Sequence, residues 1–271
     1  MWHAEPQTVL TIALVALTYV AASIRLKRRP NQRQQMAFWM GILVLALSLT
    51  GPLDAYAKGF SFSAYIFQQM ILVFIAPPLL LLGLPDWMAR PVMMNRFVEP
   101  FARRLTRPLI AFLTFSMFFA LLHYPALCDQ ICHARPFYGS IRVALVSVGL
   151  LLWWPMLSPL PEYPRLSYPM QILYLFLLMI PMTAVAAPIT MAETVLYMYY
   201  GMGQHPFGLT PLADQVLGGL IMWIGQGVYV MFVFSGIFFR WAQREDSEIP
   251  AINRKPATIH VIRPLTRPAT P

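Results

Sequence analysis

Seven long apolar runs alternate with short polar connections along most of this chain. The runs lie near residues 8–24, 36–53, 63–84, 108–123, 138–157, 170–190 and 213–239. Each is close to the roughly 20 helical residues needed to cross a hydrocarbon core about 30 Å thick. They lack the alternation of a membrane strand, and in lipid a helix pairs all of its backbone N–H and C=O groups within one segment. The pattern predicts an all-α membrane bundle of about seven transmembrane helices.

The composition agrees with lipid as the main solvent, since 58% of the residues are hydrophobic and only 11% are charged. A formal charge of +9 would suit nucleic-acid binding if the basic residues formed one face. They stand instead in clusters between apolar runs, so we expect membrane lipid and no nucleic acid as a partner. The first run has its basic residues after it, the reverse of a signal peptide, and we expect a retained span.

The clusters also predict the orientation. Connections 25–33, 85–107 and 158–169 and the segment after residue 239 hold 17 of the 20 Lys and Arg residues, whereas the alternate connections hold only Lys58 and Arg135. By the positive-inside rule the first set is cytoplasmic. We therefore expect the N-terminus outside, the C-terminus in the cytoplasm and a multi-pass protein of the bacterial inner membrane. Residues 1–245 would form the membrane domain, and the proline-rich, basic stretch 246–271 a disordered tail.

The connection HYPALCDQICHARP places Cys128, Cys132 and His133 together on the predicted outer side. Thiolate and imidazole are ligands that Cu(I) favours, so this C-x3-C-H arrangement is a candidate copper site. The alternatives are a local disulfide, two unrelated buried thiols, or one packed cysteine beside one without a role. Because cysteines four residues apart on a regular helix are poorly placed to bridge, a disulfide would require a non-helical loop.

A second outer connection holds Met198, Met202 and His205, and thioethers are also Cu(I) ligands. Methionine is frequent in this chain, however, and clusters of Met with tyrosines at a membrane boundary more often pack or form an aromatic belt than bind metal.

Arg142 lies about one turn inside the fifth run, where a charge is costly and is usually paired or functional. Carboxylates at the same predicted membrane level are Asp54, Asp129, Glu193 and Asp214. We expect a buried ion pair between Arg142 and one of these four, with Asp54 and Asp214 as candidate buried charges.

Six strings of this sequence resemble the CtaG family of bacterial cytochrome c oxidase assembly proteins. They are GPLDAYAKGFSFSAY (51–65), IAPPLLLLGLP (75–85), HYPALCD (123–129), LLWWPMLSPLP (151–161), RLSYPMQILYLFLLMIPM (165–182) and LTPLADQVLGGLIMW (209–223). The resemblance implies a membrane assembly factor for a haem-copper oxidase, with oxidase subunits as partners and copper handled at the outer face.

The family usually has paired histidines at the start of the third and fifth spans. Here Tyr65 and Gln69 occupy the first pair of positions and Tyr138 and Arg142 the second. These side chains do not replace imidazole as Cu(I) ligands, and a guanidinium would repel the ion. Of the ligand histidines that the resemblance implies, His123 is present.

The sequence thus favours an assembly or accessory factor that handles copper. A permanent subunit of a respiratory complex and a small-solute transporter are the alternatives. Transport is less favoured because no internal repeat of the spans is apparent. We expect no enzymatic activity, since the common nucleophile, metalloprotease, P-loop and dinucleotide motifs are absent from the sequence.

Overall fold

The computed structural model describes residues 5–59, 61–133, 135–202 and 208–253, with only the backbone given for 135–138 and 246–253. All regular secondary structure in this part of the chain is helical, which confirms the predicted all-α class. The helices are α1 (Pro6–Arg25), α2 (Gln32–Thr50), α3 (Pro52–Ala57), α4 (Phe62–Met70), α5 (Ala76–Gly83), α6 (Asp86–Met93), α7 (Glu99–Leu105), α8 (Pro108–Leu122), α9 (Pro125–His133), α10 (Arg135–Leu157), α11 (Tyr168–Thr190), α12 (Met198–Gly201), α13 (Pro211–Leu220) and α14 (Gln226–Asn253).

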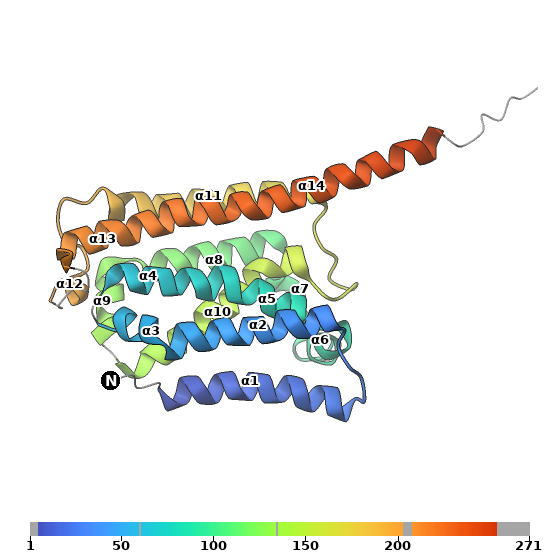
Figure 1. Cartoon of the computed structure of the whole chain (residues 1–271), viewed down its shortest axis with the longest axis horizontal. Coiled ribbons are helices and arrows are strands. Elements are labelled where there is room, and N and C mark those ends of the chain that lie inside the picture. Colours follow the sequence, from blue (N-terminus) through green and yellow to red (C-terminus); the bar gives the residue numbers. More distant parts are fainter. Residues whose placement is uncertain (1–4, 60, 134, 203–207, 254–271) are drawn as a thin grey trace, which may run out of the picture.

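The long helices lie side by side and form a bundle (Figure 1). Several of them begin where the sequence supplies a start signal. Pro6, Pro52, Pro108 and Pro211 each occupy the first position of a helix, where a missing N–H is not needed. Asn31 forms a reciprocal capping box with Gln34 at the start of α2.

Five helical segments are long and apolar enough to cross a membrane: Pro6–Arg25, Phe62–Gly83, Gly139–Leu157, Tyr168–Thr190 and Pro211–Glu245. A sixth is counted if α7 and α8, which meet at an angle of 78°, form one span. The remaining predicted run, 36–53, corresponds to the helix α2, whose first turn is Gln-Arg-Gln-Gln. The protein is therefore a multi-helix membrane protein, with five or six helices meeting the length and composition criteria against the seven expected.

Small residues allow close approach between helices where side chains would keep them apart. A Cβ on Gly83 of α5 would lie only 2.5 Å from the backbone nitrogen of Phe38 on α2, so a side chain cannot be accommodated without a shift. The carbonyl of Gly83 also accepts a hydrogen bond of 3.1 Å from Tyr19 of α1. Tyr19 stacks on Phe38 with 3.7 Å between ring centroids. These contacts join α1, which is otherwise largely exposed, to the bundle.

The span formed by α4 and α5 contains a π-helical turn, Ile71–Ile75, directly before a helical Pro-Pro pair. Pro77 and Pro78 have no N–H to donate, so the carbonyls four residues earlier, Val73 and Phe74, lose their usual partners. Trp153 Nε1 of α10 donates to the Val73 carbonyl at 2.9 Å, and the Tyr229 hydroxyl of α14 donates to the Phe74 carbonyl. Two neighbouring helices thus supply the hydrogen bonds that the prolines remove, as a helix in lipid requires.

The bundle has two chemically different ends. The short helices α3, α9 and α12 lie at one end, and α6 lies at the other (Figure 1). We call the first the α9 end and the second the arginine-rich end, because the connections there include 25–33, 85–107 and 158–169. The assignment of these ends to membrane sides stays a prediction, as does disorder of the tail, of which residues 254–271 lie outside the described part.

Candidate functional site

A buried network of charges occupies the α9 end. Asp54 of α3 and Arg142 of α10 are only 3% and 4% exposed, and Arg142 Nη2 pairs with Asp54 Oδ1. Lys58 Nζ lies 2.7 Å from the other carboxylate oxygen, and 3.0 Å from Glu5 at the start of α1. Gln68 of α4 donates to Asp54 at 3.1 Å. The arrangement neutralises Arg142 and fastens four helical segments together.

Asp214, the other predicted buried charge, lies at the start of α13 and is 1% exposed. Its carboxylate accepts hydrogen bonds from the Ser61 and Ser63 hydroxyls and from the Phe62 backbone N–H at 2.6 Å. These donors belong to the first turn of α4, where the helix dipole favours an anion. Asp214 therefore has a structural role: it holds the start of α4 against α13.

Cys128 and Cys132 lie in α9 as free thiols that are 1% and 3% exposed. Because α9 is a regular helix here, the non-helical loop required for an easy disulfide is not present. The hydrogen bond between the two thiols is the main cause of a raised pKa at Cys128 and a lowered pKa at Cys132. Tyr65 forms a hydrogen bond with Cys128, and Cys132 Sγ lies 3.6 Å from the Tyr200 hydroxyl.

This contact of Tyr65 places the thiol pair beside the start of α4, one of the positions where the CtaG-like pattern has histidine. His123, at the end of α8, is 3% exposed, and its Nδ1 lies 2.8 Å from the Phe119 carbonyl. Its Nε2 is buried with no hydrogen-bond partner among the described residues. Gln69, 1% exposed, likewise has no described partner for either amide atom.

The third member of the predicted C-x3-C-H site lies away from the thiols. His133 is exposed, its Nδ1 donates to the Asp129 carbonyl at 2.6 Å, and its ring packs edge-on against Tyr199. The Asp129 carboxylate accepts the backbone N–H groups of Met198 and Tyr199 at 3.1 and 3.2 Å. Asp129 and His133 thus connect α9 to α12.

In the second candidate set, the two methionines lie at the surface of the protein. Met198 and Met202 are 62% and 76% exposed, and His205 lies outside the described residues, as does the side chain of Tyr138. Within the described ranges, no three His, Cys, Asp or Glu side chains are arranged to hold a metal ion. The two thiols of α9 are the soft donors that the fold brings together.

Several partners in this site were missed by sequence reasoning. Gln68 and Tyr200 stand in apolar or aromatic stretches and carry no motif. The Asp54–Lys58 ion pair could have been predicted from the sequence, because the two opposite charges have the i, i+4 spacing of a helical pair.

The sequence matches the model of the cytochrome c oxidase caa3 assembly factor family, Caa3_CtaG, over residues 17–244. Uncharacterized protein Mb0105 of Mycobacterium bovis is 27% identical over 252 residues, which cover 86% of this chain and 38% of the relative. Uncharacterized protein ML1998 of Mycobacterium leprae is 23% identical over 268 residues, 90% of this chain and 40% of the relative. The chain therefore spans about two fifths of the length of these curated relatives. No solved structure matches it significantly.

The family match extends from the middle of α1 to the arginine-rich end of α14 and so includes every residue of the charge network except Glu5, together with both thiols. It agrees with the resemblance seen in the six sequence strings. This chain belongs to the Caa3_CtaG family of cytochrome c oxidase caa3 assembly factors.

Proposed function

We propose that this protein assists the assembly of a haem-copper cytochrome c oxidase from within the bacterial inner membrane, where it contacts oxidase subunits. The observation that carries the proposal is the family match over residues 17–244. The multi-helix membrane architecture supports it, since a partner inserted in the membrane is reached most directly through helix contacts there.

We further propose that Cu(I) is handled as cargo at the α9 end by Cys128 and Cys132. Thiolate sulfur is a preferred ligand of Cu(I), and this ion is stable with as few as two ligands. The two thiols are reduced, adjacent and hydrogen-bonded to one another, and one turn of α9 holds them on the same face. The donor set therefore fits a two-coordinate cargo site.

The burial of both thiols has a consequence for such a role. At 1% and 3% exposure they are shielded by the packing of α9 against its neighbours, including Tyr65 and Tyr200. Loading or release of an ion then requires α9 to move relative to α4 or α12. A shielded pair suits transient retention, because water and competing thiols reach it slowly.

The physiological test is deletion of the gene and growth under copper limitation. We expect the activity of a copper-containing terminal oxidase to fall while an unrelated membrane enzyme is unchanged, and the intact gene to restore it. Unchanged oxidase activity in low copper would contradict the assembly role. Co-purification in mild detergent separates the alternatives, because a permanent subunit would be recovered with the mature oxidase in a fixed ratio.

The copper proposal has its own test. A thiol titration under denaturing conditions comes first and should find two free thiols. Anaerobic titration against a Cu(I) competitor should then show binding that is lost in the Cys128→Ser, Cys132→Ser double variant. The matched control is Met198→Leu, Met202→Leu, which removes the exposed thioethers and should leave the affinity unchanged. Equal affinity in the cysteine variant and the parent would remove the thiol site.

A further inference from the structure

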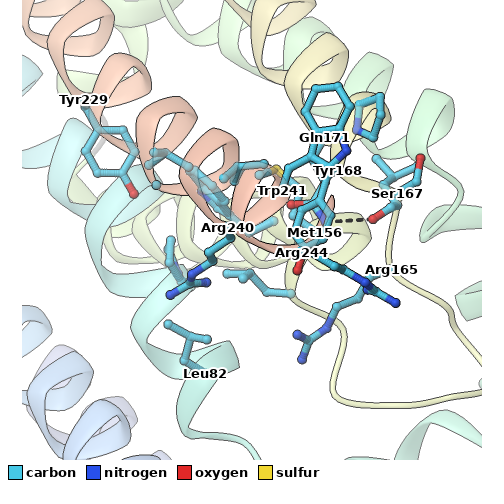
Figure 2. A pocket seen from close by; sticks show the side chains of 18 of the residues that line it. Leu82, Met156, Arg165, Ser167, Tyr168, Gln171, Tyr229, Arg240, Trp241 and Arg244 are labelled. Carbon is cyan, nitrogen blue, oxygen red and sulfur yellow. Dashed lines mark hydrogen bonds between the residues drawn. The ribbon is translucent and has the colours of Figure 1, made fainter. Parts of the chain in front are cut away.

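A cavity of about 880 Å³ opens at the arginine-rich end, away from the thiols and the charge network. It lies among the ends of α5, α10 and α14, the start of α11 and the loop that precedes α11 (Figure 2). Its volume is within the range of roughly 300–1,000 Å³ that is typical of ligand pockets.

The inner wall of the cavity is apolar. Pro78 and Leu82 of α5 contribute to it. Trp153, Met156 and Ile237 also line it, and each of these three side chains is at least nine-tenths buried. Such a wall is suited to hydrocarbon.

The mouth of the cavity is strongly basic. Arg165, Arg240 and Arg244 line it, and Glu245 is the one acidic residue among the described residues of the lining. Glu245 accepts a hydrogen bond of 2.9 Å from Trp241 Nε1. Arg165 Nε donates to the Ser158 carbonyl at 2.8 Å, which fixes the guanidinium and uses one of its five N–H donors.

Tyr168 and Trp241 stand at the same mouth as the arginines (Figure 2). Aromatic side chains with a polar tip are typical of the level where lipid headgroups meet hydrocarbon. Guanidinium groups match the geometry of phosphate and can donate two parallel hydrogen bonds to it. The cavity thus combines an apolar interior, an aromatic border and a phosphate-binding rim.

We propose that this cavity is a binding site for an anionic phospholipid of the surrounding bilayer. The phosphate and the rest of the lipid headgroup face the three arginines. An acyl chain lies along the apolar wall. Charge complementarity selects this occupant, because three arginines and one glutamate among the described lining residues favour a lipid with a net negative charge over a zwitterionic one. The inference stands independently of copper handling and of the oxidase partner.

The test uses the full chain in mild detergent and native mass spectrometry with added dioleoyl phosphatidylglycerol or dioleoyl phosphatidylcholine. The parent should retain one phosphatidylglycerol about tenfold more tightly than phosphatidylcholine. In the triple variant R165Q/R240Q/R244Q this preference should disappear. A second triple variant, R165K/R240K/R244K, keeps the charge and should keep most of the preference.

The matched control is R25Q/R28Q/R29Q, which removes three exposed arginines at the end of α1 and just after it that do not line the cavity. It should bind phosphatidylglycerol like the parent. Far-UV circular dichroism confirms that each variant is folded before binding is measured. Inorganic phosphate, added as a soluble competitor in the millimolar range, should not displace the lipid.

Three results would overturn the proposal. They are equal retention of the two lipids by the parent, an equal loss of preference in the glutamine variant and the control, and displacement of the lipid by inorganic phosphate. The last result would identify a site for a soluble anion instead of one for a lipid.

Discussion

The hydrogen bond from Tyr229 to Phe74 offers a sharp test of how the bundle tolerates its Pro-Pro pair. Replacing Tyr229 with phenylalanine keeps the ring and removes the donor that satisfies the Phe74 carbonyl. Pro78 cannot supply an N–H in its place. A buried acceptor left without a partner costs about 1–3 kcal/mol, whereas measured hydrogen bonds between membrane helices average about 0.6 kcal/mol. We therefore expect a loss of about 1 kcal/mol, or on the order of 2–4 °C in Tm for a chain of this size.

A double-mutant cycle tests the cause as well as the size. Pro78→Ala restores an N–H at position 78 that can bond the Phe74 carbonyl, so Tyr229→Phe should cost less in that background by at least about 0.5 kcal/mol. Reversible unfolding in mixed detergent and SDS, followed by far-UV circular dichroism, measures each free energy. Tyr124→Phe, at a residue that is 64% exposed, is the control and should be neutral. Equal costs of Tyr229→Phe in the two backgrounds would refute the proposed link to the proline.

Two further predictions concern topology and the buried charges. Reporters fused after residue 30 or after residue 245 should signal cytoplasm and those within 54–61 the outside, and a cytoplasmic signal from 54–61 would overturn the orientation. Asp54→Ala should destabilise the protein by about 3–5 kcal/mol in the same SDS assay, because it removes the ion-pair partner of the buried Arg142. Adding Arg142→Met should recover much of that loss, and no recovery would show that the damage lies elsewhere.

The positions of most of the long apolar helices were predictable because hydropathy reports burial in lipid directly. The prediction was less accurate where a span is not one straight helix. The run 108–123 is preceded by α7, and the two helices meet at 78° around Thr106 and Arg107. A hydropathy pattern fixes the length of a segment but carries no information on the angle between two segments.

The same limit applies to the partner of Arg142. Four carboxylates shared its predicted depth, but depth does not fix the position of a residue around the bundle. The structure gives three of them different partners: Asp54 pairs with Arg142, Asp214 binds the start of α4, and Asp129 binds the start of α12. Only the packing of the helices, which depends on non-local contacts such as that between Gly83 and Phe38, decides among them.

The candidate metal ligands show why spacing in sequence is a weak guide to a site. Cys128 and Cys132 are four residues apart and share a face of α9, whereas His133 follows Cys132 directly and therefore points about 100° away. In a helix the six-residue pattern C-x3-C-H cannot place all three ligand side chains on one face. The structure accordingly buries both thiols and leaves His133 exposed beside Tyr199.

Two of the positions that carry histidine in the CtaG-like pattern, Tyr65 and Arg142, have other partners in this chain. Tyr65 contacts Cys128, and Arg142 Nη2 contacts both Asp54 and Gln68, at 3.5 Å from the Gln68 side-chain oxygen. A neutral imidazole at position 142 carries no charge, so it would not balance the negative charge of the Asp54 carboxylate. The guanidinium is thus part of what holds α3, α4 and α10 together. Arg142 therefore has a structural contact at a position where the CtaG-like pattern has histidine, and the soft donors beside Tyr65 are the thiols of α9.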